Sequence, residues 1–438
     1  MERLNQYAIK FLFHVKEIPE KDEPSNFKGS FEHIPYDDWS DKITSAPIIS
    51  KELNHDFSFA KIYKTIEGKR FGFDDSIYPQ FLKFTTHLSS LPIFLNQASE
   101  EFILDETFNW VIDSFLANRI YFQLIPYLQN RIDEETEIRT YHFPVLNLLI
   151  EEPFQIGNTN FQFFTKQYFD EYWNKSKKTK EKKEDFDKLF SKYCGKVFIS
   201  CNAKAEPKKS EELAYTEACL AMDVFRLFSS AVVIPTKILK VDLERRININ
   251  FNSDYLIETF DKERRIRLNM LANNEPYYFN KGLYNLVVDN GLTLFSDFIK
   301  TPKKDELYNL ILQSISFYSY VLSIPDLHLR ISQEIMIIEG LLLEADWVNK
   351  MQEKTKIRLC NLMFPKQSQE YTMLNSVIIS MYQVRNAITH KGSRLPIDKI
   401  KFRDLQITLL NLLKKLIVFN QKMRNKNELI AYIDSLQV

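Results

Sequence analysis

Apolar residues recur at spacings of three and four through the last third of the chain, the pattern of helices that each bury one face. This pattern, with its proline and glycine boundaries, predicts helices over residues 304–323, 327–349, 353–364, 371–390 and 397–423. Short connections between such helices are typical of an antiparallel bundle. We therefore expect an all-α region over residues 301–438.

The first 300 residues combine strand-like and helical patterns, so the expected fold class is α+β, with a mixed region over residues 1–300. Two apolar runs around Glu67-Gly68 predict a β-hairpin. Residues 7–15 are apolar enough to predict a buried strand. Further patterns predict strands at 195–200, 237–243 and 246–252, helices at 106–126 and 210–230, and a turn at 289–291.

A lysine-rich run, residues 174–188, lies inside this mixed region and marks a possible internal boundary near residues 174–195. Such a run is usually a solvated loop or an exposed helix, and a basic segment that contacts RNA is the alternative.

One arginine interrupts the apolar stripe of the helix predicted over residues 371–390. Arg385 follows Leu374 by eleven residues, which places it about 20° from Leu374 around the helix. A guanidinium cannot be neutralised in a protein, so an inward-facing arginine needs a partner or a ligand. Glu339, at the edge of the apolar stripe of the helix predicted over residues 327–349, is a candidate ion-pair partner. The stripe itself consists of Leu374, Val377, Ile378, Met381, Val384 and Ile388.

Asn386 and His390 lie one turn apart on the flank of the same helix, with Thr389 beside them. In the last helical turn, the negative end of the helix dipole favours the protonated form of His390. Arginine, asparagine and histidine at one helix end suit a phosphodiester, because they supply positive charge, an amide and a group for proton transfer.

Composition excludes several classes of site. The chain has 438 residues and only 9 glycines, and it contains neither GxGxxG nor GxxxxGK[ST], so a Rossmann or P-loop nucleotide site is not expected. Lys+Arg and Asp+Glu are both 58, so any RNA site must be a local patch. No metal site and no cofactor is expected. The adjacent pairs Asp37-Asp38 and Asp74-Asp75 are expected in solvated loops.

The 4 cysteines form no CxxC pair and are expected to be free thiols in a reducing compartment. No apolar run reaches about 18 residues, and the first residues lack the apolar core of a signal peptide. We therefore expect a cytoplasmic protein that does not contact a membrane.

The run RNAITH, residues 385–390, matches R-N-x-x-x-H, the form of the RxxxxH motif of HEPN domains. The upstream residues 311–343, which include Glu339 in EGLLL, resemble the paired helices of Apea-like HEPN domains. The resemblance covers roughly residues 303–425. For residues 1–300, only length and general character resemble the N-terminal regions of anti-phage proteins of this type.

The resemblance implies a HEPN bundle with a ribonuclease site at Arg385 and His390, assisted by Asn386. Cleavage in such enzymes is metal-independent, because the RNA 2′-hydroxyl attacks the neighbouring phosphorus, and the substrate must then be RNA. Tyr382 and Thr389 join Glu339 as supporting residues. In the following loop, Lys391 and Arg394 would bind RNA phosphates.

The resemblance also implies a biological role, a toxin-like effector of bacterial anti-phage defence that acts by abortive infection. A homodimer through the HEPN region and a phage-derived trigger or regulatory partner would accompany it, with residues 1–300 as sensor or regulator. One alternative is a catalytically inactive HEPN module that serves as an interaction scaffold. Another is a CRISPR accessory ribonuclease, which needs a Rossmann-like N-terminal domain that the glycine shortage disfavours.

Overall fold

The computed structural model describes residues 1–18, 49–53, 59–167, 170–171, 180–246, 256–260, 266–270, 276–344, 350–366 and 368–436. The chain forms two compact units. Unit 1 comprises Met1–Arg139 and Ala203–Leu213, and unit 2 comprises Thr140–Asn202 and Ala214–Val438. The expected boundary at residue 301 lies inside unit 2, after two helices that follow its last strand.

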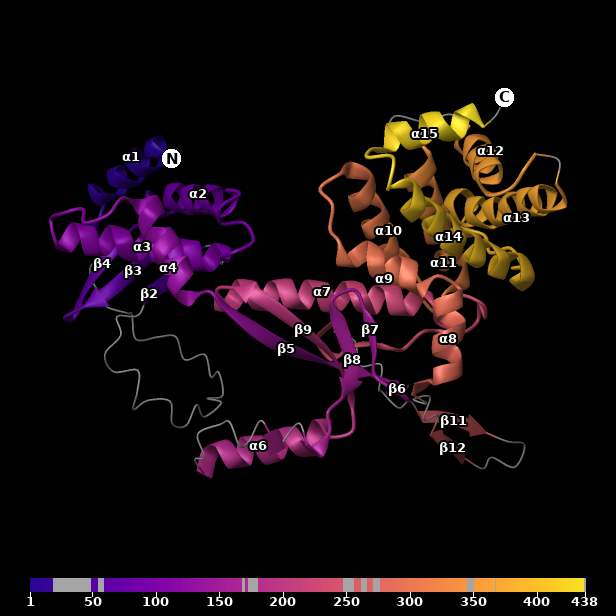
Figure 1. The fold of residues 1–438 in the computed structure, drawn as a ribbon, viewed down its shortest axis with the longest axis horizontal. Helices are drawn as coiled ribbons and strands as arrows, with labels where there is room; N and C mark the ends of the chain where they lie inside the picture. Colours follow the sequence, from indigo (N-terminus) through magenta and orange to yellow (C-terminus); the bar gives the residue numbers. More distant parts are fainter. Residues whose placement is uncertain are drawn as a thin grey trace. The chain divides into compact units, whose positions relative to one another are not determined.

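Unit 1 is an α+β unit in which helices cover one antiparallel sheet (Figure 1). The sheet has the strand order β1-β4-β3-β2. Its core is rich in phenylalanine, in which the rings of Phe73 and Phe81 contact each other and both contact the rings of Phe11 and Phe108. The elements are α1 (Glu2–Leu12), β1 (Lys16–Glu17), β2 (Ile49–Leu53), β3 (Phe59–Ile66), β4 (Lys69–Phe73), α2 (Tyr78–Ser89), α3 (Glu100–Leu116) and α4 (Leu124–Glu135).

The predicted hairpin is confirmed. Strands β3 and β4 pair antiparallel with Ile66 opposite Lys69, which leaves Glu67 and Gly68 as a two-residue turn. Both turn residues have positive φ, 50° and 81°. This conformation matches the right-handed twist of the strands that it connects, and glycine adopts it without steric cost.

Two predictions in unit 1 are wrong. Residues 7–15 do not form a strand, because α1 covers Glu2–Leu12 and buries Asn5, Ala8 and Phe11, three residues apart. That spacing is helical, and it becomes visible only when the segment is extended back to residue 2. Residues 106–126 are not one helix either, since α3 ends at Leu116 and Pro126 lies in the first turn of α4, where proline is tolerated.

Unit 2 begins with a five-stranded sheet of order β10-β5-β9-β8-β7. A parallel pair, β6 with β13, and an antiparallel pair, β11 with β12, are additional. The strands are β5 (Glu137–Leu146), β6 (Leu148–Ile150), β7 (Phe154–Ile156), β8 (Thr159–Phe163), β9 (Val197–Ala205), β10 (Asp242–Leu243), β11 (Leu256–Phe260), β12 (Ile266–Met270) and β13 (Tyr277–Phe279).

Helix α7 (Pro207–Leu227) packs on this sheet, as the contacts of Phe225 with Phe154 and Phe161 show. It confirms the helix predicted over residues 210–230, and β9 confirms the strand predicted near 195–200. Of the strand predicted over 237–243 only Asp242–Leu243 pairs as a strand, and residues 247–252 of the next predicted strand lie outside the described residues. Lysine-rich residues 180–193 form helix α6 (Lys180–Tyr193).

The C-terminal part of unit 2 is helical throughout its described residues, and α10, α11, α13 and α14 pack against one another (Figure 1). The turn predicted at 289–291 is confirmed, and the apolar runs that flank it are helices. The helices are α8 (Lys281–Asp289), α9 (Leu292–Lys300), α10 (Glu306–Val321), α11 (Leu327–Leu342), α12 (Met351–Met363), α13 (Gln369–Lys391), α14 (Lys399–Phe419) and α15 (Lys426–Ser435).

All five predicted C-terminal helices are present, with boundaries shifted by a few residues, and α15 was not predicted. Residues 345–349, the predicted end of the second helix, lie outside the described residues. Among the described helices, none is long and apolar enough to cross a membrane.

Candidate functional site

Helix α13 carries the RxxxxH run at its C-terminal end. The helix begins after Ser368, whose Oγ accepts a hydrogen bond from the Tyr371 N–H. It ends at Gly392, a left-handed residue with φ 60°, whose N–H bonds back to the Ile388 carbonyl. The predicted apolar stripe is buried, except that Ile388 is half-buried. The stripe therefore fixes the orientation of the helix and places Arg385 at the edge of the core.

Arg385 forms an ion pair with Glu339, the partner predicted for it. Its Nη2 lies 3.4 Å from Oε2 of Glu339 on α11, and the side chains are 25% and 7% exposed. Its Nη1 donates to Oδ1 of Asn386 at 3.3 Å. The guanidinium also lies 5.9 Å from the ring centroid of Tyr382. These contacts use only part of the five N–H groups of the guanidinium, so part of it remains able to bind an anion.

Glu339 is held from a second side. The hydroxyl of Tyr382 donates to its Oε1 at 2.9 Å, so each carboxylate oxygen has a donor. Burial raises the pKa of Tyr382 well above its usual range, and the nearby Glu339 carboxylate contributes to the rise. The tyrosine is therefore a fixed hydroxyl donor, and Glu339 orients the Arg385 side chain.

His390 lies apart from this buried pair. Its side chain is exposed in the last turn of α13, and within the described residues it makes no hydrogen bond or ion pair. Thr389 is also exposed, and its Oγ1 donates to the Arg385 carbonyl at 2.9 Å. Five helical steps separate Arg385 from His390, an angle of about 140°. A single copy of the helix therefore does not converge both groups on one point.

The loop after α13 is tied to the start of α11. Arg394 is 70% exposed and its Nη2 lies 2.7 Å from Oδ2 of Asp326, which also caps α11. Nε2 of His328 lies 2.8 Å from the Leu395 carbonyl oxygen. The ion pair with Asp326 holds Arg394 in the loop that follows His390. The side chain of Lys391 lies outside the described residues.

The two adjacent acidic pairs, Asp37-Asp38 and Asp74-Asp75, are the remaining candidates for metal ligands. Asp37-Asp38 lie outside the described residues. Asp74 accepts from the Ser76 N–H and hydroxyl at 3.1 and 2.6 Å and is paired with Lys16, which lowers its pKa. It thus stabilises a turn. Among the described residues, no group of three or more His, Cys, Asp or Glu side chains is placed to hold a metal ion.

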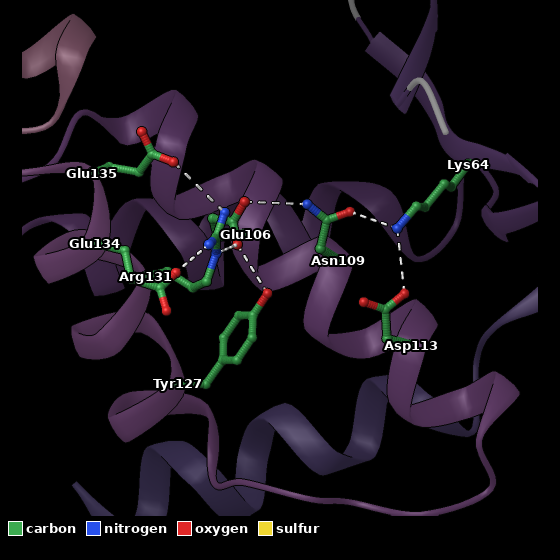
Figure 2. Close-up of polar contacts among 8 residues, drawn as sticks. All are labelled: Lys64, Glu106, Asn109, Asp113, Tyr127, Arg131, Glu134 and Glu135. Atoms are coloured by element: carbon green, nitrogen blue, oxygen red, sulfur yellow. Dashed lines mark hydrogen bonds and ion pairs between the residues drawn. The ribbon is translucent and has the colours of Figure 1, made fainter. Parts of the chain in front are cut away.

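Sequence reasoning missed several polar clusters. In unit 1, the Glu106 carboxylate accepts from the Tyr127 hydroxyl and from Arg131 Nε, both at 2.9 Å (Figure 2). The hydrogen bond that Arg131 donates to Glu106 holds the pKa of Arg131 above its ordinary value. Tyr127 and Arg131 belong to α4 and Glu106 to α3, so the cluster joins these two helices.

The same cluster continues to the sheet of unit 1. Lys64 on β3 is 7% exposed, and its Nζ donates to Asn109 Oδ1 at 3.0 Å and to Asp113 Oδ1 at 3.3 Å (Figure 2). Asn109 in turn donates to Glu106 at 3.3 Å. Because these charges are mutually paired, their simplest role is to hold α3 against β3. The sequence signal for this cluster was the spacing of Glu106, Asn109 and Asp113, which places three polar residues on one face of α3.

A second missed cluster lies in unit 2, where α7 meets the bundle. Arg226 Nη1 lies 2.7 Å from Asp242, and Arg246 Nη1 lies 2.6 Å from Asp223. The Ser319 hydroxyl of α10 donates to Asp223 at 2.8 Å. Asp223 and Arg226 are almost fully buried, so this network fixes α7 to α10. Charged residues inside the apolar stripe of α7 were the signal.

No known protein family, curated protein or solved structure matches the chain. The likeness to HEPN domains therefore depends on the residues of the sequence itself.

Proposed function

We propose that unit 2 carries a metal-independent RNA endonuclease at the C-terminal end of α13. The observation that supports this proposal is the placement of Arg385, held at the edge of the core by Glu339, with Asn386 beside it and an exposed His390 in the last turn. This arrangement gives one fixed cation and one solvent-accessible imidazole within a few residues of each other.

The roles follow from the chemistry of each group. Arg385 would bind the scissile phosphate and stabilise the negative charge that develops as the 2′-hydroxyl attacks. Asn386 would orient the phosphate. His390 would transfer the proton, and its exposure to solvent leaves the imidazole accessible for this role. Arg394, and Lys391 by its position in the sequence, would hold neighbouring phosphates.

The site would be composite. Because Arg385 and His390 project about 140° apart, two copies of α13 related by a two-fold axis would supply both groups to a shared crevice. We therefore propose a homodimer that pairs through the helical region. The role in abortive anti-phage defence, with the remainder of the chain sensing a phage-derived trigger, follows from the HEPN resemblance and belongs to the same proposal.

The test is cleavage of a mixed RNA pool by the purified full-length chain. His390→Ala should lower the cleavage rate about 100-fold or more, the usual contribution of proton transfer. His87→Ala is the matched control, because His87 is an exposed histidine in the last turn of α2. Cleavage should persist in EDTA and leave 2′,3′-cyclic phosphate ends. Dependence on a divalent ion would contradict the mechanism.

A second candidate function is a catalytically inactive scaffold. The Arg385–Glu339 contact favours it, because an arginine that a carboxylate already neutralises is also a common structural ion pair. If RNA ends sequenced from cells that produce wild-type protein and His390→Ala protein are the same, and the purified chain cuts no RNA, the scaffold function is the better one.

A further inference from the structure

Helices α11 and α14 meet at a pair of fully buried polar side chains that the proposed nuclease site does not use. Glu334 and Gln406 are both 0% exposed. Gln406 Nε2 donates to Glu334 Oε1 at 3.1 Å. Nearby positions of the same two helices, including Ile331, Ile335 and Leu409, are buried apolar residues.

The other oxygens of this pair are left without partners. Glu334 Oε2 and Gln406 Oε1 are buried and accept no hydrogen bond from the described residues. A carboxylic acid and an amide are complementary planar groups, because the acid O–H donates to the amide oxygen while the amide N–H donates to the acid carbonyl. Two buried acceptors without a hydrogen between them are costly, and one proton would satisfy both.

We propose that Glu334 is held as a neutral carboxylic acid that donates its proton from Oε2 to Gln406 Oε1, so that acid and amide form a two-bond clamp between α11 and α14. The ligand of this site is thus a proton. Burial in the apolar core acts in the same direction, because it raises the pKa of the Glu334 carboxyl to about 8.

The neighbouring charges do not replace that proton. Arg330, one turn earlier on α11, directs its guanidinium to main-chain carbonyls, with Nη1 2.7 Å from the Pro235 oxygen and 3.3 Å from the Lys237 oxygen. Tyr318 on α10 donates its hydroxyl to the Gln406 main-chain oxygen at 2.9 Å, and burial keeps this phenol protonated by raising its pKa. Within the described residues, Arg330 of α11 and Tyr318 of α10 are the charged or titratable groups whose charge acts on Glu334, and α14 presents the neutral amide of Gln406.

Loss of the proton would change more than one contact. An ionised Glu334 would repel the Gln406 oxygen and attract Arg330, its neighbour at i−4. Arg330 would then leave the carbonyls of Pro235 and Lys237, which lie in the segment between α7 and β10. The proton on Glu334 therefore couples the α11–α14 contact to this connecting segment.

The test uses the full-length chain and the variant Glu334→Gln, an isostere of the neutral acid that preserves both hydrogen bonds. The folded acid keeps its proton to a higher pH than the unfolded acid, so wild-type stability should fall as pH rises from about pH 5 through the raised pKa. The denaturant midpoint of wild-type protein should therefore drop between about pH 6 and about pH 9 more than that of Glu334→Gln.

Glu370→Gln is the matched control, because Glu370 is exposed in the first turn of α13, and it should retain the wild-type pH dependence. Infrared spectra of wild-type protein at neutral pH give a second readout. They should contain the C=O band of a buried carboxylic acid, and this band should be absent from Glu334→Gln. If that variant does not fold, the band should disappear from wild-type spectra as the pH is raised. An unchanged pH dependence in folded Glu334→Gln, or no acid band in wild type, would overturn the proposal.

Discussion

At the scale of single residues, the chain shows how an apolar helix accommodates an arginine. The stripe of α13 would bury Arg385, and the molecule instead leaves its side chain 25% exposed and supplies Glu339 as a partner. A single carboxylate thus accepts both from the guanidinium and from the Tyr382 hydroxyl. A site built from one orienting carboxylate and one cation is sensitive to the loss of either.

Glu339→Ala should lower the free energy of unfolding by about 3 kcal/mol, because it leaves Arg385 and the Tyr382 hydroxyl without their acceptor. Glu339→Gln should cost less, since its amide oxygen still accepts from Tyr382. Chemical denaturation measures both. Glu152→Ala, which removes the exposed pair with Lys281, should change stability by less than about 1 kcal/mol.

The double variant Glu339→Ala/Arg385→Ala separates the energy of the Glu339–Arg385 contact from the other effects of each substitution. If the two residues stabilise each other, the double variant should lose less stability than the sum of the single variants. Strict additivity would show that the contact contributes nothing to stability.

At the scale of elements, capping residues set the ends of the helices of unit 2. Gly392 stops α13 two residues after His390, in a left-handed conformation that places the following loop against α11. Side chains at the N-terminal ends act in the same way, as when Asp398 accepts from the Ile400 and Lys401 N–H groups at the start of α14. Such ends are encoded within a few residues of each terminus.

Gly392→Ala should lower stability by about 1 kcal/mol, because φ is 60° there and an alanine Cβ disfavours this conformation. Space is not the cause, since a Cβ at Gly392 would meet no atom within 4 Å. Gly340→Ala is the matched control inside α11, where a Cβ also meets nothing within 4 Å. It should raise stability by about 1 kcal/mol, and opposite shifts in thermal midpoint would check the pair.

At the scale of the whole molecule, the chain divides into two units, and neither of them is one continuous segment of the sequence. Residues 203–213 belong to unit 1, although the residues on either side of them belong to unit 2. The chain therefore passes between the units within β5, β9 and α7, three elements that cross the division. Each unit is a mixed or partly mixed α+β structure, and the helical region is a part of unit 2.

The composite site makes a prediction about assembly. Light scattering on the purified protein should give the mass of two 52.0 kDa chains, because one copy of α13 directs Arg385 and His390 to different sides. Mixing Arg385→Ala with His390→Ala chains should restore part of the cleavage, since the shared crevice of a mixed dimer would keep one Arg385 and one His390, supplied by different chains. A monomer that cuts RNA at full rate would contradict the composite site.

The sequence by itself determined the local structures. Helical periodicity located the five predicted helices of the bundle, the Glu67-Gly68 pair located the hairpin, and Gly392 located the end of α13. These succeed because a turn, a cap or a buried stripe depends on residues within a few positions of one another. The sequence also named Glu339 as a partner for Arg385, since a buried charge restricts the choice.

Only the tertiary structure decided which distant polar groups meet. Glu334 and Gln406 are 72 residues apart, and the Ser319 hydroxyl meets Asp223 across 96 residues. No local pattern records these pairs, because they depend on how the helices pack and on which side chains lose their water. The tertiary structure also decided that a carboxylate fixes Arg385 while His390 is exposed to solvent.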